Sequence, residues 1–433
     1  MSATIEQIHE AIARALEAHQ QVVQHRDTDS IIGAIAETAK RWREPTNPWR
    51  LRALKEAPAA TGFSEPMVGE AIDLTFGALT REALGELVDG ELGNRHILDE
   101  FCLRGRTRCR VAGPRLIAHF LAGNVPPPGI VSICIGLLLK SANIVKMSNR
   151  DPVFPALFAE SLRNVDAVLA DSVAVLDWAR QDLTLTEAAL AEANAVIAYG
   201  DDQTVSTLCQ LAPESATFLG YGHKISFGLV AKEAMTVENL PKLAEAAAFD
   251  ASVYDQQGCL SPHLFYMEEH GELGPRKFAA ALADAMAAYQ QRVPRGTLSV
   301  EEAAAFTQVR TGYEFRAASD RRVAVWSSPN SNDWCVVYED DPSFTPSCLN
   351  RMVFVKPIDG LKRVLDSTKQ VASKVSTVGV APMTTRTTAF AASLSNIGVH
   401  RVCPIGQMQR PPLSWHHDGR PNLAGLVRWT DFG

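Results

Sequence analysis

Short buried strands and helices alternate from residue 115 onward, and this alternation restricts the fold more than any other feature of the sequence. The expected elements are a strand at 115–122, a turn at 123–128, a buried helix at 129–139, a strand at 142–147, a strand at 195–199 and a helix at 203–210. Strands separated by helices of this length form a mostly parallel sheet. Ligands bind such sheets beyond the carboxyl ends of the strands. The sequence therefore predicts an α/β fold with a site at strand-to-helix turns.

The composition restricts the partners and the compartment. A net charge of −7 over 433 residues argues against a nucleic-acid partner. The longest apolar run, 129–139, is too short to cross a bilayer, so no membrane insertion is expected. The first residues lack the apolar core of a signal peptide. Eight scattered cysteines without a CxxC pair suit a reducing compartment, and the cytoplasm is the expected location.

An arginine-rich segment follows a helical N-terminal region of about 95 residues. Residues 102–111 are expected to form one strand, because Arg104, Arg106, Arg108 and Arg110 alternate with smaller residues. This cationic face could contact a phosphate-bearing ligand. The interpretation we favour is a solvated or subunit-contacting face, since charged runs usually face solvent.

A second α/β region is expected at about 256–385. Its expected helices lie near 275–290 and 300–306, and its expected strands at 322–326, 335–338 and 352–355. The tail at 407–433 is rich in proline, tryptophan and histidine and too irregular for a helix. It is expected to be a packed or subunit-bridging extension.

Cys259 lies in a polar turn, Asp255–Pro262, between two apolar segments. A thiol on such a turn is a candidate nucleophile, because the flanking elements hold it while the loop exposes it. Gly258 allows a substrate, or a backbone N–H aimed at an oxyanion, to approach closely. The alternative is a small buried cysteine that only packs.

Four polar turns share an order that points to one family. They are Gly123-Asn124-Val125-Pro126, Lys146-Met147-Ser148-Asn149-Arg150, Gly200-Asp201-Asp202 and Gly258-Cys259. From about residue 110 to 430, their order and spacing resemble the aldehyde dehydrogenase superfamily. The closer resemblance is to its acyl-CoA reductase (LuxC-like) branch. That likeness rests on the Gly-Asn-Val-Pro turn, the loop around Cys259, and the tail segments Trp415–Gly419 and Leu426–Trp429.

The resemblance implies a fold of three parts. These are N-terminal helices with a Rossmann-type cofactor-binding domain at 1–255, a catalytic domain carrying Cys259 at 256–385, and a segment at 386–433 that returns to the cofactor domain and supplies an oligomerisation tail. The family's habit also implies a homo-oligomer.

The resemblance further implies reduction of an acyl thioester to the aldehyde. Cys259 would attack the thioester of an acyl-CoA or acyl-carrier substrate, with a fatty acyl group expected, and form a thioacyl-cysteine. Asn124 matches the superfamily's asparagine, whose amide donates to the oxyanion. The alternative for Asn124 is a turn former before proline.

The same resemblance implies a nicotinamide cofactor. Lys146 matches the lysine on the adenosine ribose, and Ser148 and Arg150 lie where a 2′-phosphate would be, which favours NADPH and leaves NADH open. Gly200 and Asp201 form the turn expected near the pyrophosphate. The alternative for Lys146 and Arg150 is ordinary surface charge.

One departure from the family pattern concerns the residue that activates water. Where hydrolytic aldehyde dehydrogenases carry a Glu-Leu-Gly-Gly-Lys segment, this chain has 218–224, which contains no carboxylate. A thioacyl-enzyme should then survive until it is reduced. Two alternatives remain: a cysteine acyltransferase or thioesterase without hydride transfer, and a non-catalytic acyl-binding subunit.

The superfamily's Glu-x-x-Gly-Pro ribose clamp is also absent, replaced by Ser347–Met352. His263 is interpreted as packing or solvent-facing, and His223 as a candidate site-lining residue. No metal is expected, because His416 and His417 lack a third ligand at suitable spacing.

Overall fold

The computed structural model describes residues 3–433; Met1 and Ser2, which begin the predicted first domain, lie outside the described residues. The chain forms two compact units. The first unit comprises Met1–Thr61, Val68–His223 and Pro412–Gly433, and the second comprises Gly62–Met67 and Lys224–Pro411. The functional domain boundaries expected from the sequence stay a prediction.

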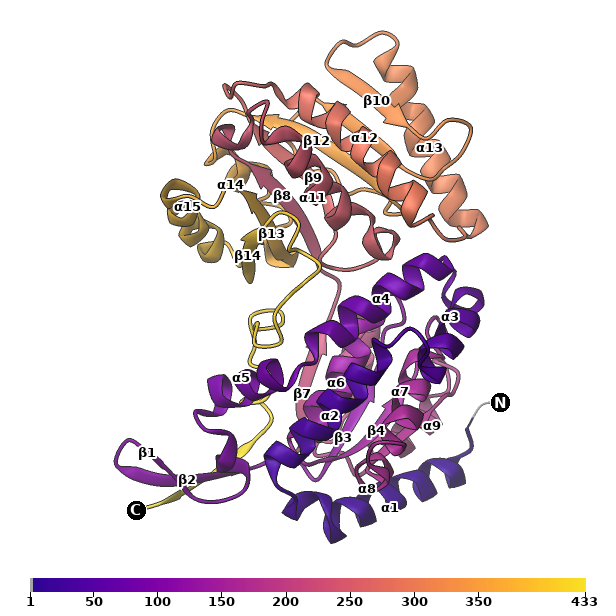
Figure 1. Ribbon diagram of the computed structural model, residues 1–433, viewed down its shortest axis with the longest axis vertical. Coiled ribbons are helices and arrows are strands. Elements are labelled where there is room, and N and C mark those ends of the chain that lie inside the picture. The colour runs from indigo at the N-terminus through magenta and orange to yellow at the C-terminus, as the bar shows by residue number, and fades with distance from the viewer. Residues whose placement is uncertain (1–2) are drawn as a thin grey trace. The chain divides into compact units, whose positions relative to one another are not determined.

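A five-stranded parallel sheet forms the centre of the first unit (Figure 1). Its order is β5-β4-β3-β6-β7, with bounds Val173–Leu176, Ala142–Lys146, Leu116–Phe120, Ala195–Tyr199 and Thr217–Tyr221. The chain starts in the middle at β3, fills one side, and then returns to fill the other. Strand order therefore reverses between β3 and β6, which is the switch point at which doubly wound sheets bind ligands. The predicted Rossmann-type sheet is confirmed.

Ten helices of the described chain belong wholly or mainly to the first unit. They are α1 (Ile5–Gln21), α2 (Thr28–Trp42), α3 (Pro48–Thr61), α4 (Glu65–Ala78), α5 (Arg81–Leu92), α6 (Pro127–Leu138), α7 (Phe154–Arg163), α8 (Ala167–Asp171), α9 (Leu183–Leu190) and α10 (Asp202–Leu211). Helix α1 begins with a capping box between Thr4 and Gln7. Its Ile8 and Ile12 pack with α9 against alternate residues of β3. Helix α6 is apolar on nearly every side, because it is buried almost throughout its length.

The arginine-rich segment is a hairpin, so the expectation of one strand over 102–111 is wrong. Gly105, with φ of +64°, turns the chain between β1 (Cys102–Arg104) and β2 (Thr107–Ala112). The final strand β15 (Arg428–Phe432) pairs with β2, and the guanidinium of Arg104 lies over the ring of Trp429, 4.4 Å from its centroid. Because a turn intervenes, the four arginines do not share one face.

The second unit is built on a seven-stranded sheet of order β10-β11-β12-β9-β8-β13-β14. In that order, the strands are Val323–Ser327, Cys335–Glu339, Met352–Ile358, Pro262–Glu268, Ile225–Val230, Val375–Ala381 and Arg401–Pro404. All neighbouring pairs are parallel except β10 with β11. The helices are α11 (Leu240–Ser252), α12 (Pro275–Arg292), α13 (Val300–Ala317), α14 (Arg363–Ser367) and α15 (Thr385–Asn396).

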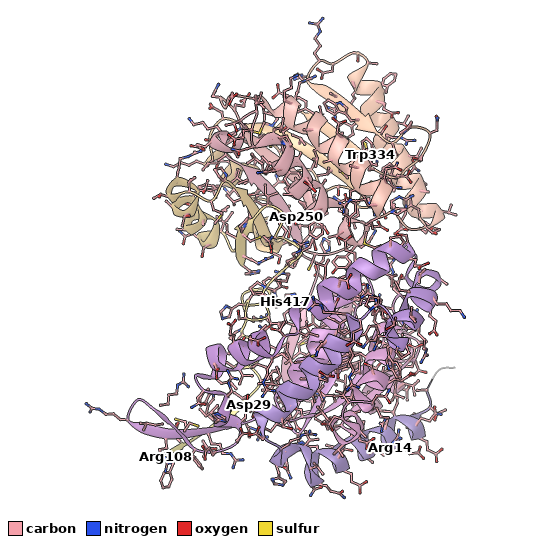
Figure 2. All side chains as sticks on the ribbon, in the orientation of Figure 1. Arg14, Asp29, Arg108, Asp250, Trp334 and His417 are labelled. Atoms are coloured by element: carbon pink, nitrogen blue, oxygen red, sulfur yellow. The ribbon has the colours of Figure 1, made fainter. Side chains whose placement is uncertain are left out.

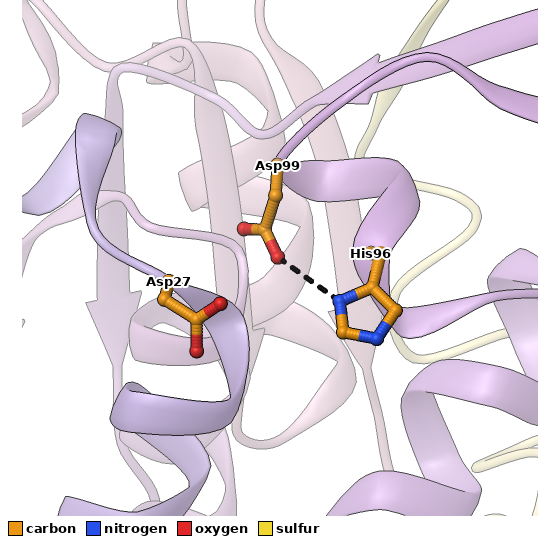
Figure 3. Close-up of side chains that lie close together, drawn as sticks. All are labelled: Asp27, His96 and Asp99. Carbon is orange, nitrogen blue, oxygen red and sulfur yellow. Dashed lines mark ion pairs between the residues drawn. The ribbon is translucent and has the colours of Figure 1, made fainter.

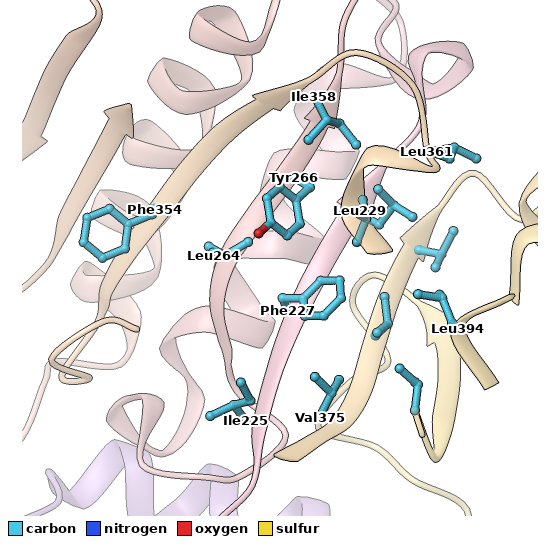
Figure 4. Close-up of a cluster of buried hydrophobic side chains, with 14 of the residues drawn as sticks. Ile225, Phe227, Leu229, Leu264, Tyr266, Phe354, Ile358, Leu361, Val375 and Leu394 are labelled. Carbon is cyan, nitrogen blue, oxygen red and sulfur yellow. The ribbon is translucent and has the colours of Figure 1, made fainter. Parts of the chain in front are cut away.

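Both faces of this sheet are buried. Leu264 and Tyr266 of β9 enter the cluster shown in Figure 4, which α13, α14 and α15 complete. Phe265 and Met267 of the same strand enter a second cluster with α11 and α12. Burial on both faces explains why these strands are nearly continuous apolar runs. The polar turns at the strand ends are thus held by a rigid core.

Candidate functional site

Cys259 lies on the turn between α11 and β9, half-buried and not in a disulfide. Its carbonyl oxygen accepts a hydrogen bond of 2.8 Å from the Ser226 hydroxyl at the start of β8. The Ser226 oxygen in turn accepts from the backbone N–H of Thr377 on β13. The backbone of the cysteine is therefore fixed to two central strands, while the residue as a whole is only partly buried.

Buried amides hold both sides of this turn. The Gln256 side chain donates to the carbonyl oxygens of Pro262 and Met352, each at 2.8 Å. On the other side, the Gln409 side chain donates to the hydroxyl of Ser261 at 3.0 Å. Such side-chain bonds give the loop the fixed geometry that a nucleophile requires.

His263, four residues after Cys259, is held in the core by the segment before β12. Its ring is buried, and its Nδ1 accepts a hydrogen bond from the backbone N–H of Ser347 at 3.1 Å. That bond puts the imidazole proton on Nε2 when the ring is neutral. The expectation that His263 packs is confirmed by its burial.

In the first unit, two of the predicted turns meet. Strands β3 and β4 are in register, so that Phe120 lies opposite Lys146, and the turns that follow them begin at the same edge. A Cβ on Gly123 would lie 2.6 Å from both the Asp151 nitrogen and the Ser148 hydroxyl oxygen. The glycine is thus required for the contact between the two turns. Asn124 follows it at the carboxyl edge.

Lys146 and Asp177 offer a donor and an acceptor at adjacent strand ends. Lys146 is half-buried, and burial lowers the pKa of its ammonium group, an effect that the nearby Asp177 charge opposes. No carboxylate forms an ion pair with this lysine among residues 3–433. Asp177 comes directly after β5, and its Oδ1 is buried without a hydrogen-bond partner in the described chain. The vicinal hydroxyls of a ribose, which both donate and accept, fit this pair.

The Gly200–Asp201 turn fits a pyrophosphate less well. The Asp201 carboxylate already caps α10, accepting from the backbone N–H of Thr204 at 2.7 Å, and this bond is the main reason why its pKa is lowered. Asp202, beside it, accepts from the backbone N–H of His223 at 2.9 Å. Two carboxylates at one helix N-terminus repel an anion. Gly200 and Asp201 stay predicted cofactor residues, with this electrostatic argument against the second.

An aromatic stack at the same edge was missed by the sequence analysis. Tyr199 and Tyr221, the last residues of β6 and β7, stack on each other with centroids 4.8 Å apart. His417 stacks on Tyr221, and Trp415 stacks on His417. The available signal was the tyrosine that ends each of two consecutive strands. The tail motif is thus attached to the carboxyl edge of the first unit's sheet, and Figure 2 labels His417.

One group of side chains in the described ranges has the spacing of metal ligands: Asp27, His96 and Asp99 (Figure 3). Asp99 already forms an ion pair with Lys140 and accepts a 2.7 Å hydrogen bond from the Thr28 hydroxyl. Asp27 caps α2 through the backbone N–H of Ser30. These bonds indicate a structural role for the cluster, which joins α2 to the segment before β1.

The predicted site residues are divided between the two units. Cys259 belongs to the second unit, whereas Asn124, Lys146, Ser148, Arg150, Gly200 and Asp201 belong to the first. Within the first unit, all six follow or end strands at the carboxyl edge of the sheet. Within the second, Cys259 precedes β9 at the amino edge.

The comparisons with known proteins agree on one family. The family model described as "Acyl-CoA reductase (LuxC)" matches residues 23–429. The chain is 27% identical over 416 residues to a long-chain acyl-protein thioester reductase of Aliivibrio fischeri, covering 93% of this chain and 81% of that protein. It is 28% identical over 409 residues to the protein of the same name in Vibrio harveyi, covering 93% and 82%.

Solved structures support the fold. An NAD-dependent benzaldehyde dehydrogenase from Corynebacterium glutamicum matches with a TM-score of 0.71 at 12% identity, covering all of this chain and 91% of that one. A glyceraldehyde-3-phosphate dehydrogenase from Methanocaldococcus jannaschii, solved with NADP, matches with a TM-score of 0.73 at 13% identity, covering 100% and 95%. The aldehyde-dehydrogenase-like fold expected from the sequence is confirmed. In the part of the chain that the structure describes, no helix has the length and apolarity needed to span a membrane.

Proposed function

The chain belongs to the acyl-CoA reductase (LuxC) family, and from this membership we propose that it reduces an acyl thioester to the free aldehyde with NADPH, through a thioacyl intermediate on Cys259. The observation that carries the proposal is the anchoring of the Cys259 turn. The Ser226 hydroxyl fixes the backbone of this residue, and the residue is only partly buried. An accessible thiol on a rigid turn is what covalent catalysis requires.

The first half-reaction forms the thioacyl-enzyme. The Cys259 thiolate attacks the thioester carbonyl carbon, and a new carbon–sulfur bond forms as the carbonyl oxygen gains charge. The backbone N–H of Cys259 stabilises that charge. We keep Asn124 as a second oxyanion donor on the family pattern of its Gly-Asn-Val-Pro turn alone. Collapse of the tetrahedral intermediate breaks the original carbon–sulfur bond, and the donor thiolate leaves and takes a proton from solvent.

The second half-reaction releases the aldehyde. When bound, the reduced nicotinamide supplies the hydride that this reduction needs. The sulfur of Cys259 then leaves as a thiolate while the carbon–oxygen double bond re-forms, so that the cysteine is ready for the next substrate.

The segment at 218–224 protects the thioacyl intermediate from hydrolysis, because it contains no carboxylate. Hydrolytic relatives need a carboxylate there to activate water, and Phe218–Lys224 contains none. Tyr221, within this segment, is buried in the aromatic stack. With no carboxylate supplied from this segment, the thioacyl group persists until it is reduced.

Lys146 and Asp177 are the residues that fit the adenosine ribose of the cofactor, as donor and acceptor at adjacent strand ends. We assign Ser148 and the exposed Arg150 to the 2′-phosphate, and therefore propose NADPH, with NADH as a weaker alternative.

We propose a long fatty acyl group as the substrate, presented on coenzyme A or on a protein. The relatives from Aliivibrio fischeri and Vibrio harveyi are named long-chain acyl-protein thioester reductases, which supports a protein-borne thioester. Because free cysteines persist in a reducing compartment, we place the reaction in the cytoplasm.

We also propose a homo-oligomer. The sheet β1-β2-β15 has two open edges and carries the exposed side chains Leu103 and Phe432 on one face. Open edges and exposed apolar side chains are features that a subunit contact would cover.

The test follows nicotinamide absorbance with purified protein, NADPH or NADH, and acyl-CoAs from short to long. Cys259→Ala should abolish cofactor consumption, whereas Cys209→Ala, which removes an exposed thiol from α10, should leave it unchanged. Aldehyde trapped as the product would identify the reduction and its preferred chain length.

Two other outcomes would overturn the reductase. A stable acyl adduct on Cys259 without cofactor consumption, measured by mass spectrometry, would indicate an acyltransferase or thioesterase. Neither adduct nor consumption, with acyl-CoA and with an acylated carrier protein, would indicate a non-catalytic subunit.

A further inference from the structure

Two runs of left-handed backbone lie next to the Cys259 turn. Tyr254, Asp255 and Gln256 have φ values of 55°, 50° and 64°, and the run Leu349–Arg351 has values of 63°, 59° and 66°. Six of the ten non-glycine residues with positive φ in the described chain are in these two runs. Each residue with a Cβ resists this conformation, and consecutive examples are rare. Something must therefore hold both runs.

The two runs lie at the same edge of one sheet. Gln256 comes three residues before Cys259 and leads into β9, and Arg351 directly precedes β12. Strands β9 and β12 are parallel neighbours, with Leu264 opposite Phe354. The runs are therefore adjacent turns at the amino edge of the second unit's sheet.

Buried side chains join these two turns directly. The Arg351 Nε donates to the Asp255 Oδ1 at 2.9 Å, and its Nη2 lies 2.8 Å from the same oxygen. The Gln257 side chain donates to the Asn350 Oδ1 at 2.9 Å. The Arg351 side chain is 1% exposed and that of Asp255 is 8% exposed, so the ion pair is shielded from water.

The same ion pair also reaches the end of α12 and the segment that follows it. The Arg351 Nη1 donates to the Gln290 side chain at 2.7 Å and to the Val293 carbonyl oxygen at 3.0 Å. The other Asp255 oxygen accepts from the backbone N–H of Gly296 at 2.9 Å. The planar guanidinium thus fixes three segments at once, which the ammonium of a lysine cannot reproduce.

We propose that Arg351 and Asp255 act together as a positioning device for the Cys259 thiol, an inference that rests on the proposed role of Cys259 as nucleophile. The ion pair holds the left-handed run 254–256, and that run sets the direction in which the chain enters residues 257–260. Both side chains are buried, so we assign them no contact with the substrate. Without the pair, the run relaxes toward right-handed backbone, and the sulfur moves away from the reacting carbonyl carbon.

The alternative is that the pair only stabilises the fold, and the chain offers a matched control. Lys356 and Glu339 form another buried ion pair in the same sheet, with side chains 0% and 7% exposed and the lysine on β12 itself. This pair lies toward the carboxyl ends of β11 and β12, away from the Cys259 edge. Arg351→Met removes the cation paired with Asp255, and Lys356→Met removes one of the two cations paired with Glu339, which keeps its ion pair with Arg316. Both variants should therefore destabilise the protein.

The experiment measures the rate of Cys259 alkylation by iodoacetamide against pH, together with kcat and KM for acyl-CoA, per folded enzyme. Peptide mapping counts only the label on Cys259. We expect Arg351→Lys, Arg351→Met and Asp255→Asn to lower kcat by at least about tenfold with KM nearly unchanged, because small displacements of a nucleophile cost rate. The pH profile of alkylation should change in the same variants. Lys356→Met should keep the wild-type kcat and profile.

Wild-type alkylation and kcat in both Arg351→Lys and Asp255→Asn would overturn the proposal. Equal losses in Lys356→Met would overturn it too, since they would reflect stability alone. If Arg351→Met does not fold, the two conservative variants decide the matter. Alkylation requires no reductase activity, so a failure of the proposed reduction is distinguished from a failure of this inference.

Discussion

The imidazole of His417 stacks on the phenol ring of Tyr221, with ring centroids 4.3 Å apart and planes inclined by 18°. Trp415 stacks on His417 at 4.9 Å, and Tyr199 stacks on Tyr221 at 4.8 Å. The returning end of the chain is therefore attached to the carboxyl ends of β6 and β7. Because parallel sheets bind ligands at that edge, the tail lies at the edge where we propose that the cofactor binds.

Replacing His417 by alanine should release the tail from this edge. The variant loses three ring contacts, with Tyr221, Trp415 and Tyr199, which together are worth about 2 kcal/mol of unfolding free energy. Urea unfolding monitored by circular dichroism measures the loss. His416→Ala is the control, because the neighbouring imidazole is exposed and should change stability by less than about 0.5 kcal/mol. Equal losses in both variants would contradict the role given to the stack.

Gly123→Ala should separate the two turns that meet at the first unit's edge. The added methyl group would lie 2.6 Å from the Asp151 nitrogen and the Ser148 hydroxyl oxygen, so that one turn must shift. We expect a loss of about 1–3 kcal/mol in unfolding free energy and weaker NADPH binding by fluorescence titration. Gly90→Ala in α5 is the control, because a methyl group added there would have no neighbour within 4 Å. Replacing an exposed glycine in a helix by alanine should increase the stability of the protein. Unchanged NADPH affinity in Gly123→Ala would contradict the proposed site.

Arg150→Ala tests the choice between the two cofactors. If the guanidinium contacts the 2′-phosphate, its loss should raise KM for NADPH about tenfold and leave KM for NADH unchanged, since one charge-assisted bond is removed. Arg163→Ala, which removes an arginine paired with Asp171 on the same unit, is the control. Equal changes for both cofactors would show that Arg150 does not select between them.

Much of the fold could be predicted because burial leaves a clear pattern. Ala195–Tyr199 was expected and found as a strand, since an apolar run ends there at Gly200. The hairpin at 102–112 was missed, because alternating arginines imitate one strand, and only the positive φ of Gly105 reveals the turn.

The site was harder to predict because its contacts join distant residues. Cys259 and the turns at Asn124 and Lys146 carry recognisable motifs. The left-handed runs do not, because residues such as Tyr254 and Leu349 have no local preference for positive φ. The stack of Tyr221 on His417 joins residues far apart in sequence, and periodicity contains no information about it.

Asp250 should make the stability of the protein depend on pH. Its carboxylate is buried in α11 and accepts hydrogen bonds from the backbone N–H groups of Gly406 and Met408. Burial raises the pKa of Asp250 to about 7, against 3.8 for the ordinary side chain. Between pH 3.8 and about pH 7, the carboxyl group of Asp250 therefore keeps its proton in the folded state but has lost it in the unfolded state. The unfolding free energy contributed by this group is highest below pH 4 and falls as the pH rises toward 7.

Asp250→Asn should remove this part of the pH dependence. The wild type should lose stability relative to the variant between pH 5 and pH 8, by roughly 2–3 kcal/mol, because one pKa unit corresponds to about 1.4 kcal/mol. Urea unfolding at both pH values measures the difference. The buried Asp151 is present in both proteins, so its contribution to the pH dependence cancels. The control is Asp284→Asn on the exposed side of α12. A parallel dependence in wild type and Asp250→Asn would show that the carboxyl of Asp250 is already ionised at pH 5. The Gln409 amide bonds both the Asp250 carbonyl oxygen and the Ser261 hydroxyl, so a change at Asp250 should also be felt in the Cys259 turn.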